Sequence, residues 1–316
     1  MQMKKTKAAF CVITALLLLA SCSGNLSLKP ASGGHPYSVL AVGDVDSTLF
    51  AVLSKEVKGL PQPEPSFDVS EINEQSFNAT WRLSRNIVIV RIDSLRYPSA
   101  QIRQEKDVYA HPQLITYIGV PTADALKIFA AKNAERLNTQ LTAFEMGAHI
   151  AVLKVKHNPK AEEKIRQLFG INMLIPAYMQ ASKQGKDFIW LSNNTANGMQ
   201  NLCIYRLEGT ADRNFIAVRD SVMRANIKGE TDDMYMTTVP RSCYISQSGT
   251  HSNGSILIKG LWEMHGDAMG GPFVSRVIRS NGATYIAEAF VFAPETKKRN
   301  LLRQIESALY TIKTKQ

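Results

Sequence analysis

The spacing of apolar residues predicts a chain in which helices and strands alternate. Apolar positions recur at helical spacing over residues 49–57, 122–141, 161–169 and 212–227. The clearest of these helices follows Pro121, and Thr122 is a residue type that caps helix N-termini. Short apolar runs of the length of a strand lie at residues 86–91, 188–192 and 201–206.

Two stretches of the chain resemble each other in the order of their elements. Each has a helix that ends at a glycine, a proline-containing turn, a strand that closes on a Trp-Leu-Ser pattern, and a strand of the form Asn-x-x-Ile-x-Arg. The first copy reads Trp81-Arg82-Leu83-Ser84, with one additional residue, and the second reads Trp190-Leu191-Ser192. This order predicts two related α/β halves, residues 37–158 and 159–316. The alternative is a coincidence between two short apolar strands that are each bounded by Asn and Arg.

The C-terminal third changes character and predicts antiparallel strands. Strand-like runs cover residues 241–246, 255–265, 273–280 and 283–292. Between the last two lies Asn281-Gly282, a strong signal for a tight hairpin turn. Counting outward from that turn pairs Arg279 with Thr284, Val277 with Ile286, and Phe273 with Phe290. A final amphipathic helix is expected to start near Pro294. The fold class is therefore α+β, with a largely antiparallel sheet, a C-terminal β-hairpin and a terminal helix.

The N-terminus carries the pattern of a secretory signal. Three lysines precede an apolar run from residue 8 to 20, which is too short to span a bilayer. The run ends in Leu19-Ala20-Ser21-Cys22, which is similar to the lipobox of bacterial lipoproteins. That resemblance implies a signal peptide over residues 1–21 and a mature protein whose first residue, Cys22, carries acyl chains such as palmitate. The alternative is an ordinary signal with a chance cysteine.

The residues after the cysteine predict where the anchored protein resides. Residues 22–36 are rich in small and polar side chains and are expected to form a flexible tether. By resemblance to the usual sorting rule, Ser23 rather than an aspartate directs the protein to the outer membrane. Surface-displayed lipoproteins often carry acidic residues just after the cysteine, and none occurs here. We therefore expect the protein to be held on the membrane by its lipid and to face the periplasm.

Composition argues against nucleic acid as a partner. The chain has 316 residues, 45% of them hydrophobic, and a formal net charge of +10. Without the three lysines of the signal, 34 basic residues face 27 acidic ones. No run of Lys and Arg interleaved with aromatic residues occurs, so nucleic acid is not an expected partner. A membrane through the lipid and an envelope protein are the partners that we expect.

Two cysteines remain after the signal and the anchor are set aside. Cys203 and Cys243 both lie in strand-like runs, and export would bring them into an oxidising compartment. They could form a disulfide or remain as two small apolar side chains. Neither has the spacing to a histidine that is typical of a metal site, and the sequence assigns no metal and no cofactor.

The segment 260–273 holds the main candidate for chemistry. If a strand continues to Asp267, then Glu263, His265 and Asp267 lie on one face, with Trp262 and Met264 on the other. Two carboxylates and an imidazole could hold a divalent ion or perform acid–base catalysis. Ligands at every second position of one strand lie about 7 Å apart, however, so a polar strand face that enters a glycine turn is the favoured interpretation.

Glu288 is a second candidate. In the hairpin register it faces Ser275 and shares a side of the strand with Ile286 and Phe290, where a carboxylate is costly unless it is paired. Arg276 lies on the opposite face and is not the obvious partner. We favour an edge of the sheet that is solvated at this point.

Together with the lipobox and the strand-and-hairpin tail, the segment 260–273 resembles an uncharacterised family of outer-membrane lipoproteins of Bacteroidetes-type bacteria, known as a domain of unknown function. The resemblance implies a lipid-anchored envelope protein and offers no activity. We therefore expect a non-enzymatic structural or protein-interaction module of the envelope. The alternative is a metal-dependent or acid–base hydrolase that acts on an envelope polymer through Glu263, His265 and Asp267.

Overall fold

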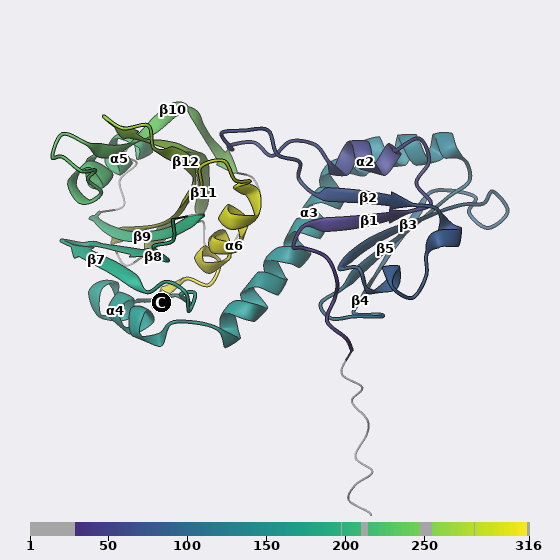
Figure 1. Ribbon diagram of the computed structural model, residues 1–316, viewed down its shortest axis with the longest axis horizontal. Coiled ribbons are helices and arrows are strands. Elements are labelled where there is room, and N and C mark those ends of the chain that lie inside the picture. Colours follow the sequence, from purple (N-terminus) through teal and green to yellow (C-terminus); the bar gives the residue numbers. More distant parts are fainter. Residues whose placement is uncertain (1–28, 197, 210–213, 247–254, 281, 315–316) are drawn as a thin grey trace, which may run out of the picture.

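The computed structural model describes residues 29–196, 198–209, 214–246, 255–280 and 282–314. Within them the chain forms two large sheets with helices packed on their faces and one small two-stranded sheet, so the α+β class is confirmed. The predicted signal peptide and Cys22 lie outside the described residues. Figure 1 shows the two halves side by side, with the long helix α3 running between them.

The N-terminal half is a five-stranded sheet in the order β2-β1-β3-β5-β4, in which only the edge strand β4 is antiparallel. Its elements are β1 (Ser38–Val42), α2 (Thr48–Leu53), β2 (Asp68–Ile72), the short helices η1 (Glu74–Ser76) and η2 (Trp81–Leu83), β3 (Asn86–Ile92), β4 (Gln101–Lys106), β5 (Leu114–Val120) and α3 (Ala123–Val155). Neighbouring residues of β3 point to opposite faces, so Val88 and Val90 pack under α2 and α3 while Ile87 and Ile89 form a second core.

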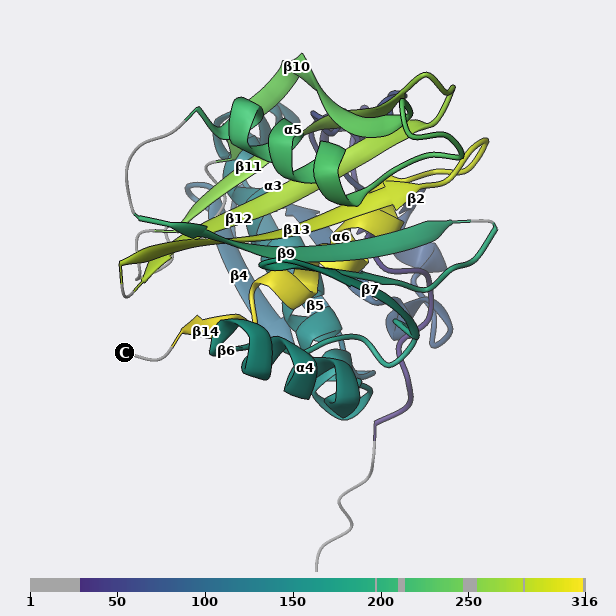
Figure 2. The same cartoon turned by 90° about the vertical axis from the view of Figure 1, so that its left-hand side faces the viewer.

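The C-terminal half is a seven-stranded antiparallel sheet in the order β10-β11-β12-β13-β9-β8-β7. Its elements are α4 (Pro159–Phe169), β6 (Ile171–Asn172), β7 (Ala181–Gly185), β8 (Phe188–Ser192), β9 (Met199–Glu208), α5 (Phe215–Asn226), β10 (Tyr235–Ser246), β11 (Ile256–His265), β12 (Gly270–Ser280), β13 (Ala283–Phe292), α6 (Arg299–Leu309) and β14 (Lys313–Thr314). Helices α4 and α6 cover one face and α5 covers the other (Figure 2).

Several sequence predictions are confirmed in detail. The hairpin has the expected register, with Val277 opposite Ile286, and Gly282 adopts the positive φ of 73° that the turn requires; Asn281 lies outside the described residues. Helix α3 begins where Thr122 caps it, since the threonine side chain accepts a hydrogen bond from the amide of Ala125. The helix at residues 161–169 is α4, which ends at Gly170 in the left-handed conformation.

The two stretches that resemble each other in sequence do not share a topology. Strand β3 pairs in parallel with β1 and β5, whereas β9 pairs antiparallel with β13 and β8. The Trp81 pattern is also not a strand. The side chain of Asn78 accepts hydrogen bonds from the amides of Thr80 and Trp81, which favours a helical turn, and η2 follows. A short apolar run between Asn and Arg predicts a buried strand, but it does not determine which strand lies beside it.

Part of the segment 22–36, predicted to be a flexible tether, is bonded to the fold. The amide of Ser32 donates to the carbonyl of His111, and the amide of Gly33 donates to that of Leu83. The amide of Arg85 donates back to the carbonyl of Gly33. These backbone bonds hold residues 31–33 against the first sheet, so this part of the segment belongs to the folded half.

The terminal helix begins at Arg299 rather than at Pro294, because a carboxylate from the other half caps it. Glu64, which is buried, accepts hydrogen bonds from the amides of Lys298 (2.7 Å) and Arg299 (3.0 Å). Arg299 also pairs with Asp68, and Arg303 donates to the carbonyl of Ser66 at 2.8 Å. A carboxylate at a helix N-terminus satisfies amides that have no partner within the helix. Helix α6 therefore joins the two halves.

A buried polar cluster lies beside this joint. The ring of Tyr37 packs against His149 of α3 at 5.8 Å and under the Arg303 guanidinium at 4.4 Å. Next to it, Glu145 of α3 accepts hydrogen bonds from Arg85 and from Asn86. Burial, together with the charge of Arg85, lowers the pKa of His149 from 6.5 to about 4.

We expect this histidine to make the fold less stable in mild acid. Because its pKa is lower in the folded chain, the unfolded state binds more protons between about pH 6.5 and pH 4, and the free energy of unfolding rises with pH across that window. The contribution of His149 should fall by about 1–2 kcal/mol between pH 7 and pH 5. Urea denaturation at both pH values should show a smaller loss for His149→Leu. An equal loss in both proteins would assign the pH dependence to other groups.

Candidate functional site

The structure separates the three residues of the first candidate site. Glu263 and His265 lie on the exposed side of β11, and Trp262 and Met264 are buried on the other, so the predicted alternation is confirmed. The strand ends at His265, however, and Asp267 lies in the following turn, where its carboxylate accepts a hydrogen bond from the amide of Ala268. The three side chains therefore do not share one strand face.

The partners of His265 also differ from those of a metal or acid–base site. Its ring stacks on the ring of Tyr235 in the neighbouring strand, with 4.8 Å between the ring centres. The guanidinium of Arg224 in α5 lies over the same tyrosine ring at 4.1 Å. Among the residues that the structure describes, no group of three His, Cys, Asp or Glu side chains could hold a metal ion. The arrangement fits the favoured interpretation, a polar strand face, and gives no support to the hydrolase alternative.

The glycines of this segment permit close packing. Gly271 faces Trp262 across the β11–β12 pair, and a Cβ atom at Gly271 would lie 2.0 Å from the carbonyl oxygen of Val291. The indole nitrogen of Trp262 donates a hydrogen bond to this same carbonyl at 3.3 Å. The absence of a side chain at Gly271 therefore lets two strands and a buried tryptophan meet.

We expect Gly271→Ala to lower the free energy of unfolding by about 1–3 kcal/mol, because the backbone must move to accommodate the methyl group. Urea denaturation followed by tryptophan fluorescence measures the change. Gly147→Ala is the matched control, since Gly147 lies in α3 with open space around it and alanine favours a helix. Equal stability of the two variants would contradict the close approach at Gly271.

Glu288 lies in the interior of the C-terminal half, so the prediction of a solvated sheet edge is wrong. Strand β13 is the fourth of seven strands, and α5 covers this face. The carboxylate is fully buried and pairs with Arg219 of α5, whose Nη2 lies 2.7 Å from Oε1 of Glu288. Ser275, the predicted neighbour across the hairpin, donates its hydroxyl to the same carboxylate at 2.6 Å.

Further contacts complete the environment of Arg219. Its Nη1 donates to the hydroxyl of Thr238 at 2.7 Å, and its guanidinium lies 4.1 Å from the ring centre of Phe273. Burial lowers the pKa of the Arg219 guanidinium, but the charge and the hydrogen bonds of Glu288, together with Tyr205 and Asp220, raise this pKa overall. A buried pair in which each charge has several hydrogen bonds is typical of a structural element that fixes one arrangement of helix and sheet.

The role of Arg219 as the partner of Glu288 was not predicted from the sequence, although the sequence contains a pattern that indicates it. Phe215, Arg219 and Met223 are four residues apart and share one stripe of α5. An arginine within an otherwise apolar stripe requires an acceptor on the opposing surface, and Glu288 was the carboxylate still without a partner. Combining the two observations would have identified the pair.

The two cysteines are free thiols, so the disulfide considered from sequence is not formed. Cys203 is fully buried in β9, and burial raises the pKa of its thiol well above the usual value. Cys243 is partly buried in β10 and packs close to Gly260 of the next strand. Both behave as small apolar side chains between the sheet and α5.

A pocket of about 260 Å³ opens on the α5 face of the sheet. Strands β9, β13, β12 and β11 form its floor, and α5 forms one wall. We call it the α5 pocket. It is lined by Leu207, Glu208, Gly209, Phe215, Val218, Ile256, Ile258, Val277, Arg279, Thr284 and Ile286.

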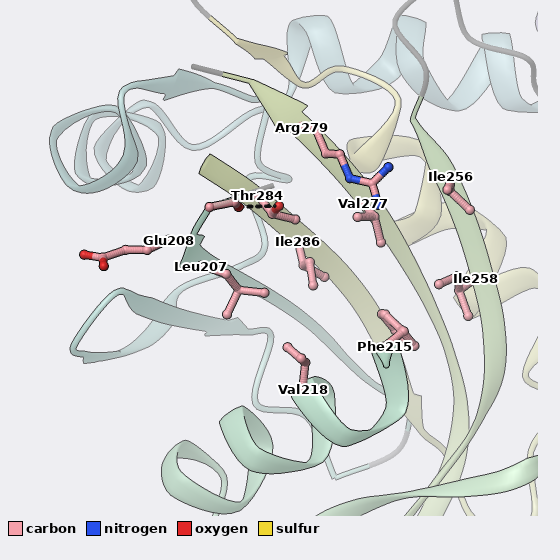
Figure 3. A pocket seen from close by; sticks show the side chains of 11 residues that line it. Leu207, Glu208, Phe215, Val218, Ile256, Ile258, Val277, Arg279, Thr284 and Ile286 are labelled. Atoms are coloured by element: carbon pink, nitrogen blue, oxygen red, sulfur yellow. Dashed lines mark hydrogen bonds between the residues drawn. The ribbon is translucent and has the colours of Figure 1, made fainter. Parts of the chain in front are cut away.

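The lining of the α5 pocket is mostly apolar. Figure 3 shows aliphatic side chains converging on it from four strands, with Val218 and Phe215 reaching in from α5, while Glu208 points away. At the rim, the hydroxyl of Thr284 donates to the carbonyl of Gly209 at 2.9 Å. Because pleated strands hold the floor, the shape of the pocket is largely set before any ligand arrives.

A second hollow lies in the N-terminal half, where β1 and β3 end. It measures about 300 Å³, and polar side chains in its lining have partners within the fold. Arg91 lies 3.7 Å from Glu74, and Asp93 accepts hydrogen bonds from the amides of Leu95 and Arg96. These contacts hold the turn after β3, and the α5 pocket is the better candidate for binding.

Two family models match the sequence, one over each half. Residues 34–154 match a domain of unknown function, DUF8532, and residues 158–311 match another, DUF4837. No curated protein matches the sequence. Within the described residues no helix, α3 included, is both long and apolar enough to cross a bilayer.

Three solved structures show weak similarity. A crystal structure from Bacteroides thetaiotaomicron VPI-5482 is 14% identical, with a TM-score of 0.28, and the match covers 46% of this chain and 45% of that one. The solution structure of cyanobacterial PsbP (CyanoP) from Synechocystis sp. PCC 6803 is 12% identical, with a TM-score of 0.27 and coverage of 46% and 87%. The lipid transfer and protein localization domain of human StarD13 (DLC2) is 9% identical, with a TM-score of 0.19 and coverage of 40% and 88%. The chain thus spans less than half of the first of these proteins.

Proposed function

We propose that this chain is a lipid-anchored protein of the bacterial envelope that binds another envelope protein through the α5 pocket. The anchor is Cys22, and the protein faces the periplasm from the outer membrane. The lipobox and the signal pattern support the anchor. The α5 pocket supports a binding role, because its lining offers a preformed and mostly apolar surface.

The size of the pocket favours an apolar side chain of a protein partner. Pockets for small molecules typically measure about 300–1,000 Å³, and the α5 pocket measures about 260 Å³. Anchor residues of protein interfaces, in contrast, insert single large apolar side chains into pockets that the partner already presents. A rigid apolar hollow of this size therefore fits one such anchor.

The test is a substitution that fills the α5 pocket, followed by a measurement of whether the partner protein still binds. Val218→Trp on α5 should occupy the pocket, so capture of the partner from crosslinked envelopes should fall at least about tenfold, as for loss of a strong anchor contact. Ala217→Trp is the matched control, because Ala217 is exposed on the same helix and does not line the pocket. Urea denaturation checks that both variants fold.

Two results would contradict the proposal. Equal capture of the partner by Val218→Trp and the wild type would remove the pocket from the interaction. Turnover of an envelope polymer by the purified protein would favour an enzyme instead.

A further inference from the structure

An apolar groove runs along the C-terminal part of α3. It measures about 650 Å³ and lies between the helix and the turn that joins β4 to β5. Gly147, Ala148 and Ala151 contribute small side chains to it, and Val152 and Val155 continue it toward the end of the helix. We call it the α3 groove.

The valines of the α3 groove are exposed to an unusual degree. In the first part of α3 the apolar side chains of Leu126, Leu137 and Leu141 are buried on the sheet. Near the end of the helix Val152 is 59% exposed and Val155 is 80% exposed. Contiguous exposed apolar surface beside a hollow is typical of an interaction site.

The N-terminal segment reaches the fold at the rim of this groove. The ammonium group of Lys29 donates a hydrogen bond to the backbone carbonyl of Asp107. The amide of His111 donates a hydrogen bond to the carbonyl of Pro30 at 2.9 Å. Asp107 and His111 both line the groove. In Figure 1 the first described residues run downward past β4.

This attachment limits how far the lipid can lie from the groove. Cys22 precedes Lys29 by seven residues. A fully extended chain covers at most about 3.6 Å per residue, so the acylated cysteine lies within about 25 Å of the rim. The bilayer that holds the acyl chains is therefore within reach of the groove.

The positive side chains around the α3 groove are complementary to an anionic membrane surface. Lys106 and Lys156 line it, and Lys154 is exposed at the same end of α3. The carboxylate of Asp107, the acidic side chain in the lining, lies 3.1 Å from the ring of His111, so two lysines face one carboxylate in the groove. Lysines that border exposed apolar side chains are typical of helices that lie in the interface of an anionic bilayer.

We propose that the α3 groove lies on the bilayer to which Cys22 is anchored. Val152 and Val155 enter the boundary between headgroups and acyl chains, and the lysines contact lipid phosphates. The proposal rests on the proposed lipid anchor. It gives the anchored protein a fixed orientation, with α3 on the membrane and the α5 face of the C-terminal half available to a partner.

The test uses the acylated mature protein in nanodiscs of phosphatidylethanolamine and phosphatidylglycerol with brominated acyl chains. A bimane label is attached at Val155→Cys, in a Cys243→Ser background that removes the partly buried native thiol. We expect the brominated lipid to lower the bimane fluorescence about twofold or more, since bromine quenches only at the depth of the acyl chains. Leu95→Cys is the control. Leu95 is 99% exposed in the turn after β3. The N-terminal segment contacts Leu83, which lies just before the other end of this strand.

Intact mass of the same sample separates the two proposals. A mass without acyl chains would overturn the lipid anchor, and the orientation with it. Acylated protein with no quenching at position 155, or with equal quenching at positions 155 and 95, would overturn the groove proposal alone. Disulfide-linked dimers of unlabelled Val155→Cys would instead assign the groove to a second copy of the chain. A Val152→Glu/Val155→Glu variant should unfold like the wild type and lose the quenching measured from a label at Ala151→Cys.

Discussion

Glu288→Gln is expected to lower the free energy of unfolding by about 3–5 kcal/mol, because it removes the buried carboxylate that pairs with the Arg219 guanidinium and leaves only the partly exposed Asp220, 3.8 Å away, as counter-charge. Both side chains are fully buried, and the carboxylate accepts hydrogen bonds from Arg219 and from Ser275. The amide of glutamine can accept one of these bonds, but it cannot balance the charge. Arg219→Met should cost a similar amount, since it leaves the carboxylate alone.

Urea denaturation of a chain that starts at Lys29 measures these changes, because the contacts of residues 30–33 with the first sheet are then kept. The double variant Arg219→Met/Glu288→Leu should recover much of the loss of either single variant, since no uncompensated charge remains. Lys127→Ala is the control. It breaks the exposed pair with Asp46 and should cost less than about 1 kcal/mol. A cost for Glu288→Gln no larger than for Lys127→Ala would contradict the buried pair.

The sequence predicted those parts of the fold that depend on neighbouring residues. The turn at Gly282 and the alternation of side chains were sufficient to place Glu288 opposite Ser275. A capping threonine and a helical apolar spacing were sufficient to start α3 at Ala123. In each case the interaction joins residues that are close along the chain, so a local pattern contains the information.

The parts that the sequence did not predict depend on contacts between distant residues. Glu64 caps α6 by contacts with Lys298 and Arg299, which lie 234 and 235 positions further along the chain. The helix therefore starts at Arg299 and not near Pro294. Arg219 meets Glu288 across 69 positions, so the carboxylate looked solvated when only its own hairpin was considered. The choice between parallel and antiparallel neighbours for β3 and β9 has the same origin, because both strands show the same local pattern, an apolar run between Asn and Arg.

Cys22→Ser should abolish attachment to the membrane through lipid. A serine hydroxyl cannot replace the thiolate as the acceptor of the diacylglyceryl group, so the exported chain should carry no acyl chains. By resemblance to lipoproteins, the signal should then remain uncut, since their signal peptidases act on the lipidated form. Several acyl chains hold a protein firmly, whereas none leaves only the apolar stretch of residues 8–20.

Intact mass spectrometry of protein extracted from membranes is the decisive measurement. The wild type should begin at Cys22, carry the added mass of several acyl chains and partition into detergent. Cys11→Ser is the matched control, because Cys11 lies within the apolar run of the signal and should be removed with it. This variant should give the same mature mass as the wild type, while Cys22→Ser should retain residues 1–21 and lack lipid. An unmodified wild-type N-terminus at any other residue would show that the lipobox is a chance pattern, and the anchored orientation proposed for α3 would fall with it.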